Sequence, residues 1–310
     1  MKVVALAGGV GGAKLADGLA RCLEAHDLTI VVNTGDDFDH FGLRICPDLD
    51  TVCYTLAGLA NPLTGWGREA ETWNALEELK RLGAPSWFQL GDRDLATHLE
   101  RTRRLQQGET LSEITQDFCR RWGVAPLVLP MSDEAVRTIV LTDEGELPFQ
   151  EYFVRYRFRP AVRDFHFTGA ETAHAAKGVL KAIESADVVV LCPSNPFVSI
   201  DPILAVNGVR EAVMKRHFIA VSPIVAGEAL KGPAAKMFHE LGIPPSPSAV
   251  ARHYLGFLRG MVLDVLDAEY APEIERMGVR SFVTQTVMKS TEDRRQLAES
   301  ILQAVKDGVL

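Results

Sequence analysis

Residues 3–33 read VVALAGGVGGAKLADGLARCLEAHDLTIVVN, and this stretch decides the fold. The runs Val3–Ala7 and Leu28–Asn33 predict two buried strands, because both are short, apolar and bounded by glycine or polar residues. Gly12–Ala25, which lies between them, predicts a helix. A strand, a helix and a second strand in this order predict a parallel pair with a helical crossover. The chain therefore begins as an α/β protein.

The same alternation continues through most of the 310 residues. It predicts a Rossmann-like, mostly parallel, doubly wound sheet with helices on both faces. Residues 61–125 depart from it, since three helical patterns follow one another there, and they predict an all-helical insertion that covers the active-site cleft. We expect residues 1–310 to form one domain that includes this insertion.

Two local signals refine this expectation. The last helix of the insertion should begin at a capping box formed by Thr110 and Glu113. Beyond the insertion, the turn residues 143–145 predict a β-hairpin, and we expect a further strand near Gln150–Phe158.

Composition excludes several classes of protein. With 47% hydrophobic and 24% charged residues the chain can bury a full core. Its formal net charge of −8 argues against a nucleic-acid partner, because phosphate backbones are bound by clustered Lys and Arg. The basic cluster ERTRR at residues 100–104 is expected to be a solvated helix face. Five scattered cysteines favour reduced thiols in the cytoplasm, and no apolar run is long enough to span a membrane.

A strongly acidic stretch follows the second predicted strand. It runs NTGDDFDHFGLRICPDLDT and contains Asp36, Asp37, Asp39, Asp48 and Asp50. Two carboxylates roughly 4 Å apart would repel each other by about 4 kcal/mol at an effective dielectric near 20. A divalent cation would relieve this repulsion, so Asp36, Asp37 and Asp48 are candidate Mg²⁺ ligands. The alternative is that they serve as turn and helix-cap residues.

The glycine-rich turn AGGVGGAK at residues 7–14 suits a phosphate group. It fails the dinucleotide pattern G-x-G-x-x-G because Lys14 stands where the third glycine belongs, and it lacks the final glycine and the hydroxyl residue of a Walker A loop. Glycine nevertheless lets the backbone approach an anion, and the helix start supplies free amides. Gly9, Gly11, Gly12 and Lys14 are therefore candidate donor-binding residues. The alternative is a tight βα turn with a solvated lysine.

Polar residues also follow later strands. The proline-stiffened loop PSNPFVSIDP comes after the apolar strand DVVVLC and puts Ser194, Asn195 and Ser199 at its carboxyl end. Open α/β sheets bind ligands at that edge, so this loop is expected to recognise a base or a phosphate. A well-formed turn without a ligand is the alternative. The same argument covers Met131 and Ser132, which follow another predicted strand.

Seven segments lie in order along nearly the whole chain and carry a resemblance. They are LAGGVGGAKLADGL, VVNTGDDFDHFGLRICPDLDTVCYTL, LGDRDLATHLERT, LPMSDEAVRT, PSNPFVSIDPIL, AVSPIVAG and MKSTEDRRQLAESIL. Together they resemble the CofD family of 2-phospho-L-lactate transferases. The resemblance implies transfer of the phospho-acid of a guanosine diphospho-donor to the ribityl hydroxyl of the deazaflavin Fo, which gives coenzyme F-420-0 or its dehydro form and GMP. It also implies Mg²⁺ as cofactor and a cytoplasmic homodimer.

The resemblance assigns roles to individual residues. Asp50 of PDLDT and Arg93 of GDRD are implied to bind Fo and to act in catalysis, Asp50 by orienting or deprotonating the hydroxyl and Arg93 by holding Fo or an oxyanion. Met131 and Ser132 join them on the Fo side. The glycine turn and the S-N-P loop are implied to bind the guanosine donor, and therefore GDP.

Other questions stay open at this level. The aromatic residues of the insertion could stack on the Fo ring or form ordinary core, namely Trp66, Trp73, Trp87 and Phe88. The donor could be lactyl-2-diphospho-guanosine, enolpyruvyl-diphospho-guanosine or a glycerate form. A non-catalytic regulator of the YvcK-like type, which binds nucleotide sugars, and an NAD-dependent oxidoreductase are the alternative classes. The oxidoreductase is disfavoured because the third glycine is missing.

Overall fold

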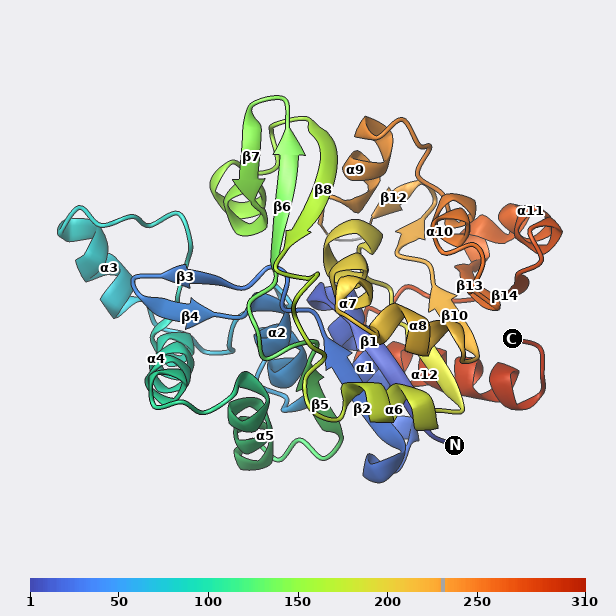
Figure 1. Cartoon of the computed structure of the whole chain (residues 1–310), viewed down its shortest axis with the longest axis horizontal. Coiled ribbons are helices and arrows are strands. Elements are labelled where there is room, and N and C mark those ends of the chain that lie inside the picture. The colour runs from blue at the N-terminus through green and yellow to red at the C-terminus, as the bar shows by residue number, and fades with distance from the viewer. Residues whose placement is uncertain (230–231) are drawn as a thin grey trace.

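The computed structural model describes residues 1–229 and 232–310, and a seven-stranded sheet forms its centre (Figure 1). In spatial order the strands are β14 (Arg280–Thr284), β13 (Gly260–Asp264), β10 (Phe218–Val221), β9 (Val188–Leu191), β1 (Val3–Ala7), β2 (Leu28–Val32) and β5 (Leu127–Pro130). Each neighbouring pair is parallel, so the predicted parallel sheet is confirmed.

The order of the strands creates a switch point between β1 and β9. From β1 the chain moves outward to β2 and β5, and it then returns to the other side of β1 to build β9, β10, β13 and β14. In the register of the sheet, Ala5 lies between Ile30 and Val190. Ligands of open α/β sheets bind at the carboxyl ends of the strands where the order reverses. The site is therefore expected above β1 and β9.

The two faces of the sheet are covered by different helices, as predicted for a doubly wound fold. Alternate residues of β1 point to opposite faces, with Val3, Ala5 and Ala7 in one hydrophobic cluster and Val4 and Leu6 in the other. The first cluster includes residues of α1 (Gly9–Cys22), α2 (Pro47–Leu56), α5 (Leu111–Arg121) and α12 (Thr291–Lys306). The second includes residues of α6 (Val179–Ser185), α7 (Asp201–Ala205), α8 (Val209–Met214), α9 (Ala234–Glu240), α10 (Pro247–His253) and α11 (Ala271–Arg276).

The described residues also form three small antiparallel sheets beside the main one. They are β3–β4 (Phe38–His40, Leu43–Ile45), β7–β6–β8 (Gly145–Pro148, Arg137–Thr142, Val162–Thr168) and β11–β12 (Ile224–Val225, Glu228–Ala229). The predicted hairpin at residues 143–145 is confirmed by β6 and β7. The strand predicted near Gln150–Phe158 is wrong, because Glu151–Arg155 forms a π-helical turn. In this conformation Phe149 and Phe153 stack with ring centroids 5.6 Å apart, a contact between residues i and i+4 that a strand could not make.

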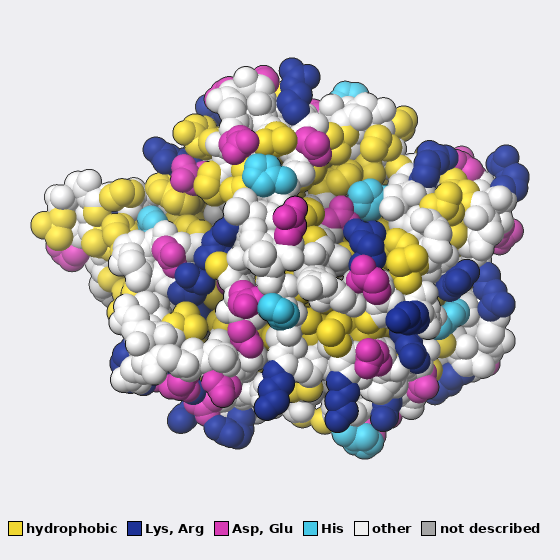
Figure 2. All heavy atoms as spheres, in the orientation of Figure 1, with side chains coloured by type: hydrophobic (Ala, Val, Ile, Leu, Met, Phe, Trp, Pro, Cys, Tyr) yellow, Lys and Arg dark blue, Asp and Glu magenta, His cyan; other side chains and the backbone are white. Residues whose placement is uncertain are grey.

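The regular structure within residues 61–125, all of which are described, is helical. It consists of α3 (Asn74–Arg81), α4 (Asp92–Gln106) and α5, and the predicted capping box of Thr110 and Glu113 opens α5. In Figure 1, α3 lies at one end of the molecule beyond the β3–β4 hairpin. Figure 2 shows hydrophobic side chains gathered at the surface of that end. Leu82, directly after α3, is one of the most exposed apolar residues of the described chain.

The start of α3 is capped from a distance. Its own N-cap residue, Trp73, makes no side-chain cap, but Asp92 at the start of α4 accepts hydrogen bonds from the amides of Asn74 (3.1 Å) and Ala75 (3.0 Å). A hydrogen bond from the Thr72 hydroxyl, together with those from Ala75 and Asn74, lowers the pKa of Asp92 to about 2. Asp92 therefore ties α3 to α4.

We predict that Asp92→Ala loosens α3 because two amides lose their acceptor. Amide hydrogen exchange in residues 74–77 should accelerate about fivefold, the usual effect of a lost helix cap. Asp39→Ala on the β3–β4 hairpin, which removes an exposed ion pair with Arg44, is the control and should leave these amides unchanged. Equal protection of α3 in both variants would contradict the assignment.

Candidate active site

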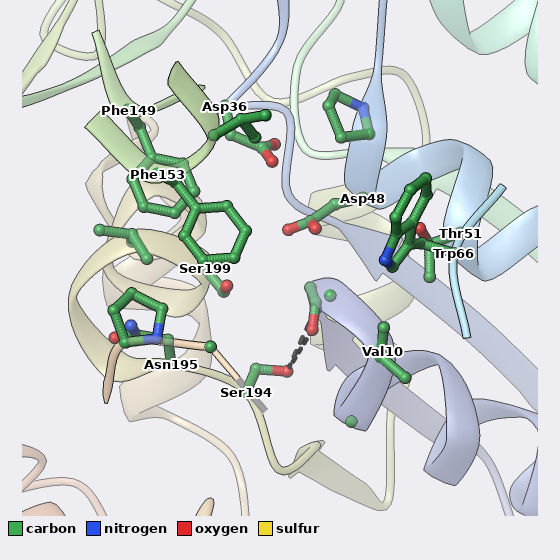
Figure 3. A pocket seen from close by; sticks show the side chains of 18 of the residues that line it. Val10, Asp36, Asp48, Thr51, Trp66, Phe149, Phe153, Ser194, Asn195 and Ser199 are labelled. Carbon is green, nitrogen blue, oxygen red and sulfur yellow. Dashed lines mark hydrogen bonds between the residues drawn. The ribbon is translucent and has the colours of Figure 1, made fainter. Parts of the chain in front are cut away.

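A cavity of about 890 Å³ opens at the carboxyl ends of β1 and β9 (Figure 3). Its walls come from the start of α1, the first turn of α2, the loop after β9, the π-helical turn and the insertion. Nine of the residues predicted from the sequence line it, namely Gly9, Gly11, Lys14, Asp36, Asp48, Asp50, Ser194, Asn195 and Ser199. The acidic stretch and the glycine turn therefore meet at one site.

Five predicted site residues lie outside this lining. They are Gly12, Asp37, Arg93, Met131 and Ser132. Met131 and Ser132 are buried, and the Ser132 hydroxyl donates to the carbonyl of His174 (2.7 Å). Arg93 is exposed, and its Nη1 donates to the carbonyl of Glu69 (3.2 Å). These contacts hold their side chains to neighbouring protein groups, and their functional roles stay predictions.

The glycine turn closely approaches the loop after β9. The Ser194 hydroxyl donates to the carbonyl of Gly8 (2.9 Å) and lies 3.2 Å from its amide. A Cβ at Gly11 would lie 2.2 Å from the carbonyl oxygen of Pro193, so no other residue fits there without a backbone shift. Gly8 precedes α1 and makes no side-chain cap, and the amide of Gly9 bonds to Asp48, so it is the following amides of the first turn that are left for another acceptor. A phosphate is the natural partner for such a helix start.

Lys14 also lines the cavity, and its ammonium group is engaged. Its Nζ donates to the carbonyl of Met288 (2.6 Å). The cation therefore lies at the edge of the glycine turn, near the start of α1. It contributes positive charge on the side of the cavity where the helix amides are found.

Asn33, directly after β2, joins two of the acidic residues. Its Nδ2 donates to Asp36 (3.3 Å) and Asp48 (3.0 Å), and its Oδ1 accepts from the amide of Gly35 (2.8 Å). Gln150 donates to the other oxygen of Asp36 (2.9 Å). We call Asn33, Asp36 and Asp48 the Asn33 group. One amide thus holds two carboxylates beside each other.

Electrostatics makes the Asn33 group a candidate cation site. Burial, followed by the charge of Asp48, raises the pKa of Asp36 well above its usual value. Burial also raises the pKa of Asp48 to about 6, although the hydrogen bond from Asn33 and the amide of Gly9 act in the opposite direction. Among the described residues the ion pairs of Lys and Arg go to other carboxylates, Asp50 for example. The pair therefore needs a proton or a bound cation, and its oxygen donors suit Mg²⁺.

A second acidic group lies on the insertion side of the cavity. Asp50, Asp94 and His98 line it, and one ligand atom from each lies within 4.8 Å of the others, so this group could hold a metal ion. Arg101, however, already donates to both oxygens of Asp50. Although burial acts against it, His98 keeps the pKa of Asp94 below its usual value. We call Asp50, Asp94, His98 and Arg101 the Arg101 group.

Aromatic side chains form two walls of the cavity. Trp66, Trp87 and Phe88 come from the insertion, while Trp73 is not part of the lining. Phe149 and Phe153 stack on the other side, with an angle of 4° between their rings, and they face Trp66 across the cavity in Figure 3. Two flat rings could therefore be accommodated.

Sequence reasoning missed several of these residues. Arg101 belongs to the ERTRR cluster, which was expected to be solvated, but the residue is only 2% exposed. That expectation is wrong for Arg101, because Asp50 compensates its charge inside the protein. Asn33 could have been found from the sequence, since it directly follows a strand. Phe149 and Phe153 were missed because the segment was wrongly predicted as a strand, in which they would not stack.

The fold and the site together define a Rossmann-type α/β protein with an acidic, glycine-edged ligand cavity at its switch point. Among the described residues, none of the helices has both the length and the apolar character needed to cross a membrane.

Comparisons with known proteins identify the family. The family model of 2-phospho-L-lactate transferase CofD matches residues 3–304. A phosphoenolpyruvate transferase of Streptomyces griseus is 44% identical over 99% of both chains, and one of Mycobacterium ulcerans is 46% identical over 91% of this chain and 92% of the relative. A crystal structure of a UPF0052-family protein from Bacillus halodurans shares the fold, with a TM-score of 0.64, 17% identity and coverage of 97% and 98%. The chain belongs to the CofD family.

The raised pKa of Asp48 predicts a pH-dependent stability. The folded protein holds this proton up to about pH 6, while the unfolded chain releases it near 3.8, so folding stability falls as the pH rises through this interval. Asp48→Asn removes that loss. We compare the free energy of unfolding of Asp48→Asn with that of wild type in metal-free buffer. The difference, variant minus wild type, should rise by on the order of 2 kcal/mol between about pH 4.5 and about pH 7.5.

Urea denaturation at several pH values, in the presence of EDTA, measures this difference. Glu144→Gln, in the exposed turn between β6 and β7, is the control for removing a carboxylate. A constant difference between Asp48→Asn and wild type across this pH range would contradict the electrostatic account.

Proposed function

We propose that this protein transfers the phospho-acid moiety of a guanosine diphospho-donor to the ribityl hydroxyl of Fo and releases GMP. The product would be coenzyme F-420-0 or its dehydro form. Membership of the CofD family supports the proposal, as do relatives called phosphoenolpyruvate transferases. The observation that carries it is the meeting of the glycine turn, the Asn33 group and Asp50 in one cavity.

For this reaction the protein has mainly to align the alcohol with the phosphorus and to compensate the charge of the diphosphate. The alcohol oxygen forms a new bond to the phosphorus that carries the acid, the bond from that phosphorus to the GMP oxygen breaks, and the hydroxyl proton is released. Phosphoryl-type transfers need little covalent work from the enzyme. The first turn of α1 with its glycine residues Gly9 and Gly11, together with Lys14, would bind the diphosphate of the donor. The S-N-P loop with Ser194, Asn195 and Ser199 would complete the donor side.

Fo would lie on the insertion side. Asp50 is available there to accept a hydrogen bond from the ribityl hydroxyl, and Trp66, Trp87 and Phe88 offer flat surfaces for the deazaflavin ring. On this basis we propose that residues 61–125 form an insert in a single domain and cover the cleft. Arg93, Met131 and Ser132 stay predicted Fo residues, although their present contacts do not favour these roles.

Mg²⁺ is the proposed cofactor. Asp36 and Asp48 would hold it, because these two buried carboxylates share one amide donor and have no cationic partner among the described residues. When bound, the ion would neutralise charge on the donor diphosphate. Asp37 was predicted with them, but it lies outside the cavity lining, so we rank it below Asp36 and Asp48 as a Mg²⁺ ligand. The Arg101 group is less favourable, since its own guanidinium already compensates Asp50.

We predict that Mg²⁺ alone raises the melting temperature of the wild type and that Asp36→Asn or Asp48→Asn abolishes the rise. The reason is that ions that bind only the folded state stabilise it. Asp94→Asn, in the Arg101 group, is the matched control and should keep the full Mg²⁺ effect. If only Asp94→Asn loses the Mg²⁺ effect, the metal binds at the Arg101 group instead.

The transfer itself is tested with purified protein, Mg²⁺, Fo and each donor in turn, and the product is read by mass spectrometry. The names of the relatives lead us to expect transfer from enolpyruvyl-diphospho-guanosine. Asp50→Asn should reduce kcat/KM for Fo by about 100-fold or more, as is typical for loss of a group that contacts the reacting hydroxyl. Absence of product with every donor, together with retained GDP binding, would favour a non-catalytic nucleotide-binding regulator.

Two further properties are proposed from the family resemblance alone. These are a homodimeric state and a cytoplasmic location. Light scattering of the purified protein tests the first.

A further inference from the structure

The Arg101 group is organised around a cation that the chain itself supplies. Arg101 lies on α4 and is 2% exposed, and its two terminal nitrogens donate to the two oxygens of Asp50 in the first turn of α2. A two-point contact of this kind fixes both the position and the rotation of a carboxylate. Because Asp50 lines the cavity and Arg101 does not, the arginine supports Asp50 from behind.

Further contacts orient the arginine. Nη1 of Arg101 lies 3.4 Å from the carbonyl of Arg44 and 3.2 Å from Nδ1 of His98. A guanidinium can only donate, so Nδ1 of His98 must accept this hydrogen bond, which leaves Nε2 as the ring nitrogen that carries a proton. Nε2 lies 3.4 Å from an oxygen of Asp94 but forms no hydrogen bond with it, and the Tyr54 hydroxyl donates to that same oxygen (2.7 Å). The hydrogen bonds that start at Asp50 therefore run through Arg101 to His98 and to the carbonyl of Arg44.

We propose that Arg101 is a positioning residue that fixes Asp50 for the acceptor alcohol, an inference that rests on the proposed function. With both oxygens of Asp50 bound to Arg101, the remaining lone pairs can still accept a hydrogen bond from a hydroxyl. The negative charge that would draw a proton away is largely compensated by the guanidinium. Asp50 therefore aligns the acceptor hydroxyl rather than removing its proton.

Loss of Arg101 should affect one substrate only. Arg101→Ala should lower kcat/KM for Fo by about 100-fold, the effect of a small misplacement of a reacting group, while GDP affinity stays within about twofold of wild type. Arg101→Lys, which keeps the charge but can contact only one oxygen well, should recover part of the activity. In an Asp50→Asn background, Arg101→Ala should cause no further loss, because the two residues act as one unit.

Arg104 offers a matched control on the same helix. It forms ion pairs with Glu109 and Asp117 outside the cavity, so Arg104→Ala removes a similar contact from α4. This variant should keep kcat/KM for Fo within about twofold of wild type. If Arg101→Ala does not fold, Arg101→Lys replaces it. Its kinetics are then compared alone and in combination with Asp50→Asn.

Three results would overturn the inference. They are equal kinetics in Arg101→Ala and Arg104→Ala, a multiplicative loss in the double variant, and a loss of GDP affinity that matches the loss for Fo. Failure of the proposed function is distinguishable, since wild type would then form no product with any donor. In that case Fo fluorescence titrations of the Arg101 and Arg104 variants test the positioning of Asp50, and equal dissociation constants would contradict it.

Discussion

The contact between the turn after β1 and the loop after β9 is the constraint on which the cavity depends. At the switch point of a doubly wound sheet, the connections leave for opposite faces and open a crevice. Here the two connections touch at its base, where Ser194 bonds to Gly8 and the Pro193 carbonyl occupies the space that a side chain at Gly11 would need. The start of α1 is consequently held in the lining beside the acidic stretch, where the amide of Gly9 donates to Asp48.

Two groups of acids share this cavity, and they differ in how their charge is compensated. In the Asn33 group a neutral amide bridges Asp36 and Asp48, so negative charge remains for an external cation. In the Arg101 group a guanidinium compensates Asp50 internally. The difference fits the two substrates that we propose. A diphosphate brings negative charge and needs a metal ion, whereas an alcohol is neutral and needs only an oriented acceptor.

The sequence predicts the sheet well because its central strands are buried on both faces and read as short apolar runs. Val3–Ala7 has the observed bounds, and the second strand ends one residue earlier than predicted. The prediction from the sequence fails for Glu151–Arg155, where β-prone residues form a π-helical turn. There, Phe149 stacks on Phe153, and local propensity does not report such a contact.

The residues of the site likewise fall into those that the sequence predicts and those that it does not. Asp36 and Ser194 could be predicted because each follows a strand of the main sheet, and parallel strands deliver their carboxyl ends to one edge. Asp48 lies in the first turn of α2, after the antiparallel β3–β4 hairpin, and only its place in the acidic stretch pointed to it. Arg101 could not be predicted by that rule, since its partner lies 51 residues away on another helix. Within ERTRR its neighbours Arg103 and Arg104 do form ion pairs at the surface or near it, which makes the whole cluster read as solvated.

A different pattern in α4 does carry the information. Successive residues of a helix are rotated by about 100°, so positions i, i+4 and i+7 share one face. Asp94, His98 and Arg101 have this spacing, and all three are buried or nearly so. On a helix that packs against a domain this stripe is normally apolar, and a polar stripe can be buried only if its charges are paired. Such a stripe therefore predicts an acidic partner on the facing element, and in this protein the partner is Asp50.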